Sequence, residues 1–144
     1  MAKKILWLDN DPVLIDDHVN ALREQGYEVT VKTTAMNAET HIRDHHYDLL
    51  ILDVMIPTKN EEEEKVYEPE KTNYGYKTGL LFYRRMKDEL AKAGTQVLVM
   101  RIKLDKEILD EFVAEGIKPE HITTKFALRN VDVFCDKIKA ILSK

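Results

Sequence analysis

Polar side chains that can do chemistry directly follow the apolar runs of this 144-residue sequence. They are Asp9, Asn10, Asp11, Asp53, Arg101 and Lys125. Carboxylates that converge in one place repel each other, so such a cluster normally holds a divalent cation or a basic side chain, and oxygen ligands favour Mg²⁺. A carboxylate beside a cation and a lysine can also attack a phosphoryl donor, because both positive groups neutralise the transferred group. The sequence therefore predicts phosphoryl chemistry, with an acyl phosphate on Asp53.

The elements that must position these residues alternate along the chain. Apolar or alternating runs predict β-strands at residues 4–9, 27–33, 48–53, 96–101 and 121–124. Amphipathic segments predict a first helix that is capped by Asp11 and ends before Gly26, and further helices at 36–45, 79–93, 106–115 and 130–144. This alternation predicts an α/β fold, a doubly wound five-stranded parallel sheet with helices on both faces. Ligands bind beyond the carboxyl ends of the strands in such sheets, which is where the polar residues lie.

One segment, residues 58–78, departs from this alternation. It contains four consecutive glutamates, and Val66 is its one aliphatic residue. We therefore expect an inserted loop within a single domain spanning residues 1–144, with no contribution to the core. Because the loop leaves directly after Asp53, it should flank the site, limit access to it, and be the most protease-sensitive part of the chain.

The amino-acid composition argues against a nucleic-acid-binding protein and against a membrane protein. The formal net charge is −4, which provides no electrostatic basis for direct contact with nucleic acid or with anionic lipid. No stretch approaches the roughly 18 apolar residues of a membrane span. The single cysteine, Cys135, has no partner for an intrachain disulfide. We expect a cytoplasmic protein that contacts neither nucleic acid nor membrane.

The motifs of the sequence resemble those of the receiver domain of bacterial two-component response regulators. The resemblance rests on LWLDNDP, YDLLILDVMIP, TGLLFYRRMK and TTKF, which occur in this order on alternating strand and helix units. It covers the chain apart from residues 58–78. Pro57 and Gly79 match a proline and a glycine that are usually separated by three residues in the family, and here twenty-one intervene. The resemblance implies a flavodoxin-like receiver fold.

The resemblance also implies roles for individual residues. Asp53 matches the aspartate that accepts a phosphoryl group from a histidine kinase or phosphotransfer protein, and Lys125 matches the lysine that reads the phosphate. Mg²⁺ would be bound by Asp9, Asp53 and the backbone carbonyl of Met55. Asn10 stands where a second acidic ligand is usual. Its amide oxygen can still coordinate the metal, but it adds no charge, so Mg²⁺ binding should be weak.

Other positions depart from the family pattern. Arg101 stands where a serine or threonine usually reads the phosphate, Ile122 replaces an aromatic switch residue, and Phe126 replaces a proline. The usual coupling between hydroxyl and aromatic residue therefore cannot operate. We expect the Arg101 guanidinium to form an ion pair with Asp9 or Asp53 in the unmodified protein, offering a carboxylate two parallel hydrogen bonds.

Three functions remain open at this stage. The first is a stand-alone receiver module, not an enzyme, that is phosphorylated on Asp53 and signals by protein contact, because no output domain follows the last helix. The second is a pseudo-receiver that binds a partner without phosphorylation, which the departures at Asn10 and Arg101 favour. The third is a phosphatase of the haloacid-dehalogenase type, in which Asp9 is the nucleophile and Asp11 the acid/base. It is the weakest, because Pro12 and Val13 replace the usual Gly-Thr.

Overall fold

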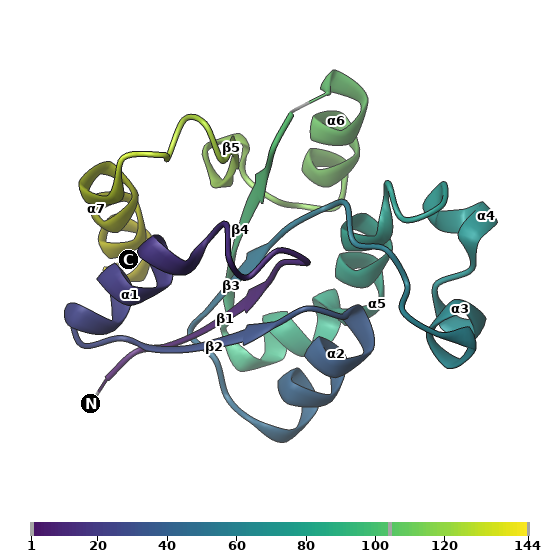
Figure 1. Ribbon diagram of the computed structural model, residues 1–144, viewed down its shortest axis with the longest axis horizontal. Coiled ribbons are helices and arrows are strands. Elements are labelled where there is room, and N and C mark those ends of the chain that lie inside the picture. The colour runs from purple at the N-terminus through teal and green to yellow at the C-terminus, as the bar shows by residue number, and fades with distance from the viewer. Residues whose placement is uncertain (1, 104, 144) are drawn as a thin grey trace.

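The computed structural model describes residues 2–103 and 105–143 and contains a five-stranded sheet (Figure 1). Its strands are β1 (Lys4–Leu8), β2 (Glu28–Lys32), β3 (Leu49–Leu52), β4 (Gln96–Arg101) and β5 (Ile122–Thr124). Neighbouring strands are parallel, and their order is β2-β1-β3-β4-β5. The predicted doubly wound sheet is confirmed, and each strand begins and ends within one residue of its predicted range.

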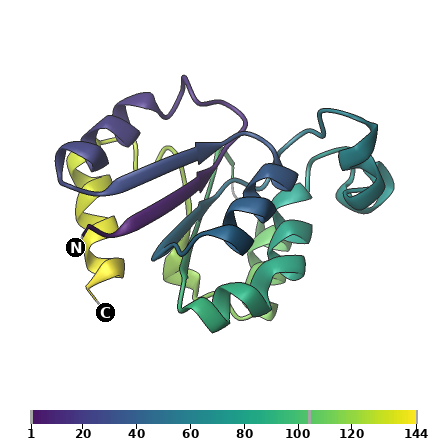
Figure 2. The same cartoon turned by 90° about the horizontal axis from the view of Figure 1, so that it is seen from below.

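Helices cover both faces of this sheet (Figure 1, Figure 2). On one face lie α1 (Asp16–Glu24) and α7 (Val131–Leu142). On the other lie α2 (Ala35–Asp44), α5 (Thr78–Ala93) and α6 (Lys106–Ala114), and a short 3-10 helix, η1 (Pro119–His121), precedes β5. Within the described residues, no helix has both the length and the apolar character needed to cross a membrane.

Alternate residues of the central strands supply the two layers of the core. In β1, Ile5 and Trp7 pack toward α1 and α7, whereas Leu6 and Leu8 pack toward α2 and α5. These four side chains are at most 1% exposed. Side chains alternate between the two faces of a strand, so a slip of one residue would exchange the two layers. The apolar pattern thereby holds the strands in register and sets which residue follows each strand end.

The first helix begins later than predicted. Residues 12–15 form turns, and α1 starts at Asp16 with Ile15 at its N-cap position. The Asp11 carboxylate accepts the backbone N–H of Leu14 at 3.1 Å, so it closes the preceding turn and does not cap the helix itself. The chain between β1 and α1 therefore remains a loop at the carboxyl edge of the sheet.

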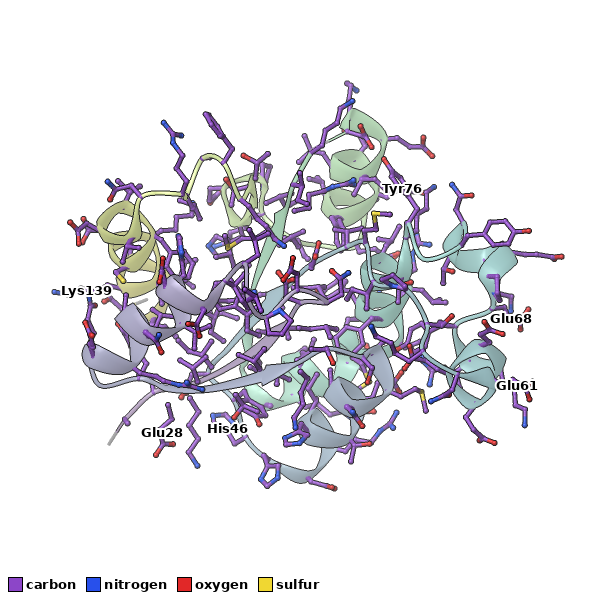
Figure 3. All side chains as sticks on the ribbon, in the orientation of Figure 1. Glu28, His46, Glu61, Glu68, Tyr76 and Lys139 are labelled. Carbon is purple, nitrogen blue, oxygen red and sulfur yellow. The ribbon has the colours of Figure 1, made fainter. Side chains whose placement is uncertain are left out.

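The segment 58–78 is folded, which corrects the expectation of a plain loop. It contains two short helices, α3 (Glu61–Val66) and α4 (Pro69–Thr72), beside α2 and α5 (Figure 1). Asn60 caps α3 by accepting the backbone N–H of Glu63 at 2.9 Å. Glu61 and Glu68 point outward, away from the sheet (Figure 3).

The expectation that this segment has no core residue is also wrong. Tyr67 is fully buried in the layer formed with α2 and α5. Its hydroxyl donates to the Glu39 carboxylate, and the Arg85 guanidinium lies 5.6 Å from its ring centroid. Aromatic rings bury a large area when their polar atom finds a partner, so one tyrosine can anchor a segment that has a single aliphatic residue.

The two ends of the inserted segment are held together by backbone contacts. The N–H of Ile56 donates to Gly75 at 3.0 Å, and the N–H of Gly79 donates to Val54 at 2.8 Å. A Cβ atom at position 79 would lie 2.2 Å from the carbonyl oxygen of Asp53, so only glycine allows α5 to approach this loop. The closed base lets twenty-one residues be inserted without displacing α5 from Asp53.

Candidate functional site

The loops after β1, β3, β4 and β5 meet at one edge of the sheet and enclose a pocket of about 470 Å³. The connection that follows β1 passes through α1 on one face of the sheet, and the connection that follows β3 passes through α5 on the other face. The edge between β1 and β3 is therefore a topological switch point. The residues lining the pocket include Asn10, Asp53, Met55, Tyr76, Arg101 and Lys125. The polar residues singled out from the sequence thus converge.

The floor of the pocket is built around the Lys125 ammonium. Its Nζ lies 2.6 Å from Asp9 Oδ2 and 3.3 Å from Asp53 Oδ2, so the contact expected between Lys125 and Asp53 is present. Asp9 is fully buried and Asp53 is 5% exposed. One lysine therefore pairs with two buried carboxylates, and the floor retains a surplus negative charge.

The protonation of these groups reflects that imbalance. Burial raises the pKa of Asp53, Lys125 opposes the rise, and the charge of Asp9 adds to it. Burial alone would lower the pKa of Lys125, but the Asp53 and Asp9 carboxylates outweigh burial and raise it. Lys125 therefore stays charged, and Asp53 is a carboxylate that additional positive charge would stabilise.

Backbone contacts orient the two carboxylates. Asp53 Oδ1 accepts the N–H of Val54 at 2.7 Å, which leaves Oδ2 facing Lys125. Asp9 Oδ1 accepts the N–H of Asp11 at 2.9 Å. Asp53 is among the residues lining the pocket, whereas Asp9 lies beneath it. Of the two, Asp53 is thus the carboxylate that is placed to meet a reactant.

Solved response regulators share this architecture. A receiver domain protein from Methanospirillum hungatei matches with a TM-score of 0.73 and 19% identity, over 99% of this chain and 95% of that chain. A response regulator from Thermotoga maritima matches with a TM-score of 0.72 and 21% identity, over the full length of both chains. No protein-family model and no curated protein matches the sequence. The chain has the receiver fold of response regulators.

The oxygen atoms expected to bind Mg²⁺ in this receiver fold lie at or beneath the pocket. Asn10, Asp53 and Met55 line it, and Asp9 lies at its floor. Hard oxygen donors of this kind suit Mg²⁺. Within residues 2–103 and 105–143, no group of three or more His, Cys, Asp or Glu could hold a metal. Because Lys125 already lies against both carboxylates, the residues fit a weakly bound cation.

Arg101 has a different partner from the one expected. The ion pair that it forms is with Asp105, from Nη1 to Oδ2 at 3.8 Å, whereas Asp9 and Asp53 pair with Lys125. The expectation of an ion pair with Asp9 or Asp53 is therefore wrong. The ammonium of Lys125 occupies the space between these carboxylates, and the Arg101 guanidinium lies 5.0 Å from the ring centroid of Tyr76.

Sequence reasoning did not identify Tyr76 or Asp105 as site residues. Both line the pocket, and the Tyr76 hydroxyl donates to Asp105. Tyr76 belongs to the inserted segment, so the segment reaches the pocket through its last residues. The helices α3 and α4 lie beyond α2 and α5 (Figure 1, Figure 2), and the described residues that line the pocket include none from these two helices. The one signal in the sequence was a tyrosine close before Gly79.

Exposed apolar side chains gather on the loops around the pocket. They are Val13, Leu14, Met55, Ile102 and Phe126, each more than half exposed. Leu14, Ile102 and Phe126 also border a neighbouring apolar hollow of about 350 Å³ that shares Lys125 with the pocket. Apolar side chains that cluster in the open are typical of a protein-contact surface.

Proposed function

We propose that this single receiver-like domain, with its insertion at residues 58–78, accepts a phosphoryl group on Asp53 and signals through protein contact. The observation that carries the proposal is the placement of the Lys125 ammonium between the Asp9 and Asp53 carboxylates at the floor of the pocket. The apolar side chains around the pocket support a protein as the phosphoryl donor, such as a histidine kinase or phosphotransfer protein.

The chemistry follows from the charges at the floor. An Asp53 oxygen forms a bond to the phosphorus of a phosphohistidine, the phosphorus–nitrogen bond breaks, and the leaving imidazole nitrogen takes up a proton. Lys125 neutralises charge on the transferred group. A bound Mg²⁺ would supply further positive charge there, with Asp9, Asn10, Asp53 and the Met55 carbonyl as its ligands.

Mass spectrometry of the intact chain tests this proposal after incubation with acetyl phosphate and Mg²⁺. We expect the mass of one phosphoryl group to be added to the wild type and to be absent from Asp53→Asn. Asp11→Asn serves as the matched control, because Asp11 lines the same pocket but its carboxylate closes a turn. An adduct that persists in Asp53→Asn would exclude Asp53 as the acceptor.

The second candidate is the pseudo-receiver, which binds a partner without phosphorylation. It is favoured by the neutral Asn10 at a metal position and by the Lys125 ammonium that already pairs with both carboxylates. The two functions separate in the same experiment, because a pseudo-receiver would show no adduct. Phosphatase activity is less well supported, since Asp9 is fully buried with one oxygen against Lys125.

A further inference from the structure

The Arg101 guanidinium is buried, and some of its N–H donors are not used in hydrogen bonds within the described residues. Arg101 is 5% exposed, and its Nε and Nη1 have no hydrogen-bond partner among residues 2–103 and 105–143. Its ion pair with Asp105, at 3.8 Å, is longer than a hydrogen bond. Buried charges are normally paired and hydrogen-bonded, because leaving them otherwise is costly. Arg101 therefore has donors ready for a stronger acceptor.

Its present partners join the exit of the inserted segment to the start of α6. The Tyr76 hydroxyl donates to Asp105 Oδ2, the oxygen that Arg101 faces, and the guanidinium lies over the Tyr76 ring. Tyr76 lies between α6 and the inserted helices (Figure 3). Asp105 is the N-cap residue of α6. Arg101, Tyr76 and Asp105 thus form a seam between two elements that flank the pocket.

The Arg101 guanidinium also interacts electrostatically with Asp53. Arg101 and Asp53 line one pocket, and the Asp53 charge acts on Arg101 against the effect of burial, which lowers the pKa of the guanidinium. A phosphoryl group on Asp53 would bring additional negative charge and several acceptor oxygens into this space. Arginine binds such groups through two parallel hydrogen bonds, which are stronger than its contacts with a ring and a distant carboxylate.

We propose that Arg101 reads the phosphoryl group on Asp53 and, by leaving Tyr76 and Asp105, loosens the seam between the inserted segment and α6. This inference rests on the proposed phosphorylation of Asp53. Lys77, which pairs with Glu107 at 3.0 Å and Glu111 at 3.4 Å, still holds the segment to α6. The change is therefore a local loosening at the exit of the insertion and not its release.

Amide hydrogen exchange followed by mass spectrometry tests the inference on the full chain, with and without acetyl phosphate and Mg²⁺. The reporters are the N–H of Lys77, which donates to Thr72 at 2.7 Å, and the N–H of Leu109, which donates to Asp105 at 3.0 Å. In the wild type we expect phosphorylation to speed their exchange about tenfold to thirtyfold, the scale of losing one largely desolvated cation–π contact. Intact mass of the same samples gives the extent of phosphorylation.

Three variants make the test specific. Arg101→Gln is compared at the extent of phosphorylation that its intact mass gives, and exchange at the reporters should be equally fast with and without the adduct. Tyr76→Phe should raise exchange before phosphorylation, because Asp105 loses a donor. Tyr74→Phe, which changes a tyrosine that is 78% exposed on the same segment, should behave as the wild type.

The outcomes distinguish the inference from the function on which it rests. Full phosphorylation of the wild type without faster exchange at either reporter would overturn the role of Arg101 and leave Asp53 as the acceptor. So would an Arg101→Gln variant that retains the whole effect. A wild type that forms no adduct would overturn both.

Discussion

Two buried carboxylate sites in this chain are neutralised to different degrees. In the anchor of the inserted segment, Glu39 receives Arg85 at 3.1 Å, Arg43 at 3.0 Å and the hydroxyl of Tyr67. In the pocket, Asp9 and Asp53 share the ammonium of Lys125. The buried carboxylate of the anchor thus meets two guanidinium groups and a hydroxyl, whereas in the pocket two carboxylates share one ammonium. The first arrangement holds structure together, and the second leaves room for a further cation.

The pKa directions follow the same division. Burial alone would raise the pKa of Glu39, but hydrogen bonds from Arg85 and Tyr67 outweigh it and lower the pKa. Burial raises the pKa of Asp53, and Lys125 does not reverse the rise. Buried carboxylates thus stabilise a fold only when their partners overcome the cost of desolvation. A site in which they do not is a candidate for binding or reaction.

The largest effect is expected at the anchor. Glu39→Gln would leave the Arg85 and Arg43 guanidinium groups without their shared carboxylate, and we expect it to lower the free energy of unfolding by about 3–5 kcal/mol. Urea titration followed by circular dichroism measures this. Glu89→Gln is the matched control, since Glu89 also pairs with Arg43 but is 43% exposed, and its loss should cost less than about 1 kcal/mol. Equal losses in the two variants would contradict the comparison.

The contribution of Glu39 should depend on pH. Because its pKa is lower in the folded protein, its stabilisation is fully present above the unfolded-state pKa of about 4.3 and is lost as pH falls through the folded-state pKa. The stability difference between wild type and Glu39→Gln should therefore be constant near neutrality and shrink below about pH 4. Urea titrations at several pH values follow it, and a difference that grows on acidification would show the opposite sign.

Removal of the Tyr67 hydroxyl should destabilise the anchor less than Glu39→Gln does. Tyr67→Phe keeps the buried ring but takes away a hydrogen bond to a charged group, so we expect a loss of about 1.5–3 kcal/mol. Residues 58–78 should remain the first site of limited proteolysis and be cleaved faster in this variant. Tyr74→Phe serves as the exposed control. First cleavage in α6 or α7 would indicate that the insertion is not the least stable segment.

In the pocket, added negative charge should improve metal binding. We expect Asn10→Asp to strengthen Mg²⁺ binding roughly tenfold, because affinity rises with the charge of the ligands. Adding Arg101→Thr should change little further, because Arg101 pairs with Asp105. Isothermal titration calorimetry compares the single and double variants. A much tighter double variant would mean that Arg101 competes with the metal after all.

The smallest effect is expected at Asp53 itself. Asp53→Asn removes a surplus negative charge while Lys125 keeps Asp9, so we expect the unfolding free energy to rise by about 1 kcal/mol or less. Its sign is opposite to that of Glu39→Gln, which is what the comparison requires. The same urea titrations measure it, and a loss as large as that of Glu39→Gln would place Asp53 among the structural carboxylates.

Much of the fold and part of the site could be predicted from the sequence. Apolar runs such as 48–52 indicated buried parallel strands, and parallel strands bring their carboxyl ends to one edge. Asp9, Asp53 and Lys125 were therefore expected to converge, and they do. The buried position of Tyr67 was not predicted, because its charged neighbours in the sequence masked a side chain whose partners, Glu39 and Arg85, lie 28 and 18 residues away.

The sequence by itself determined the strand register and the residues at the strand ends, because these depend on the short-range periodicity of apolar residues. Only the tertiary structure decided how charges are shared among them. It placed Lys125 between two carboxylates, directed Arg101 to Asp105 and Tyr76, and drew the insertion to Glu39. Ion pairs form between side chains that packing brings within a few ångströms, and that distance is set by the whole fold and not by neighbours in the sequence.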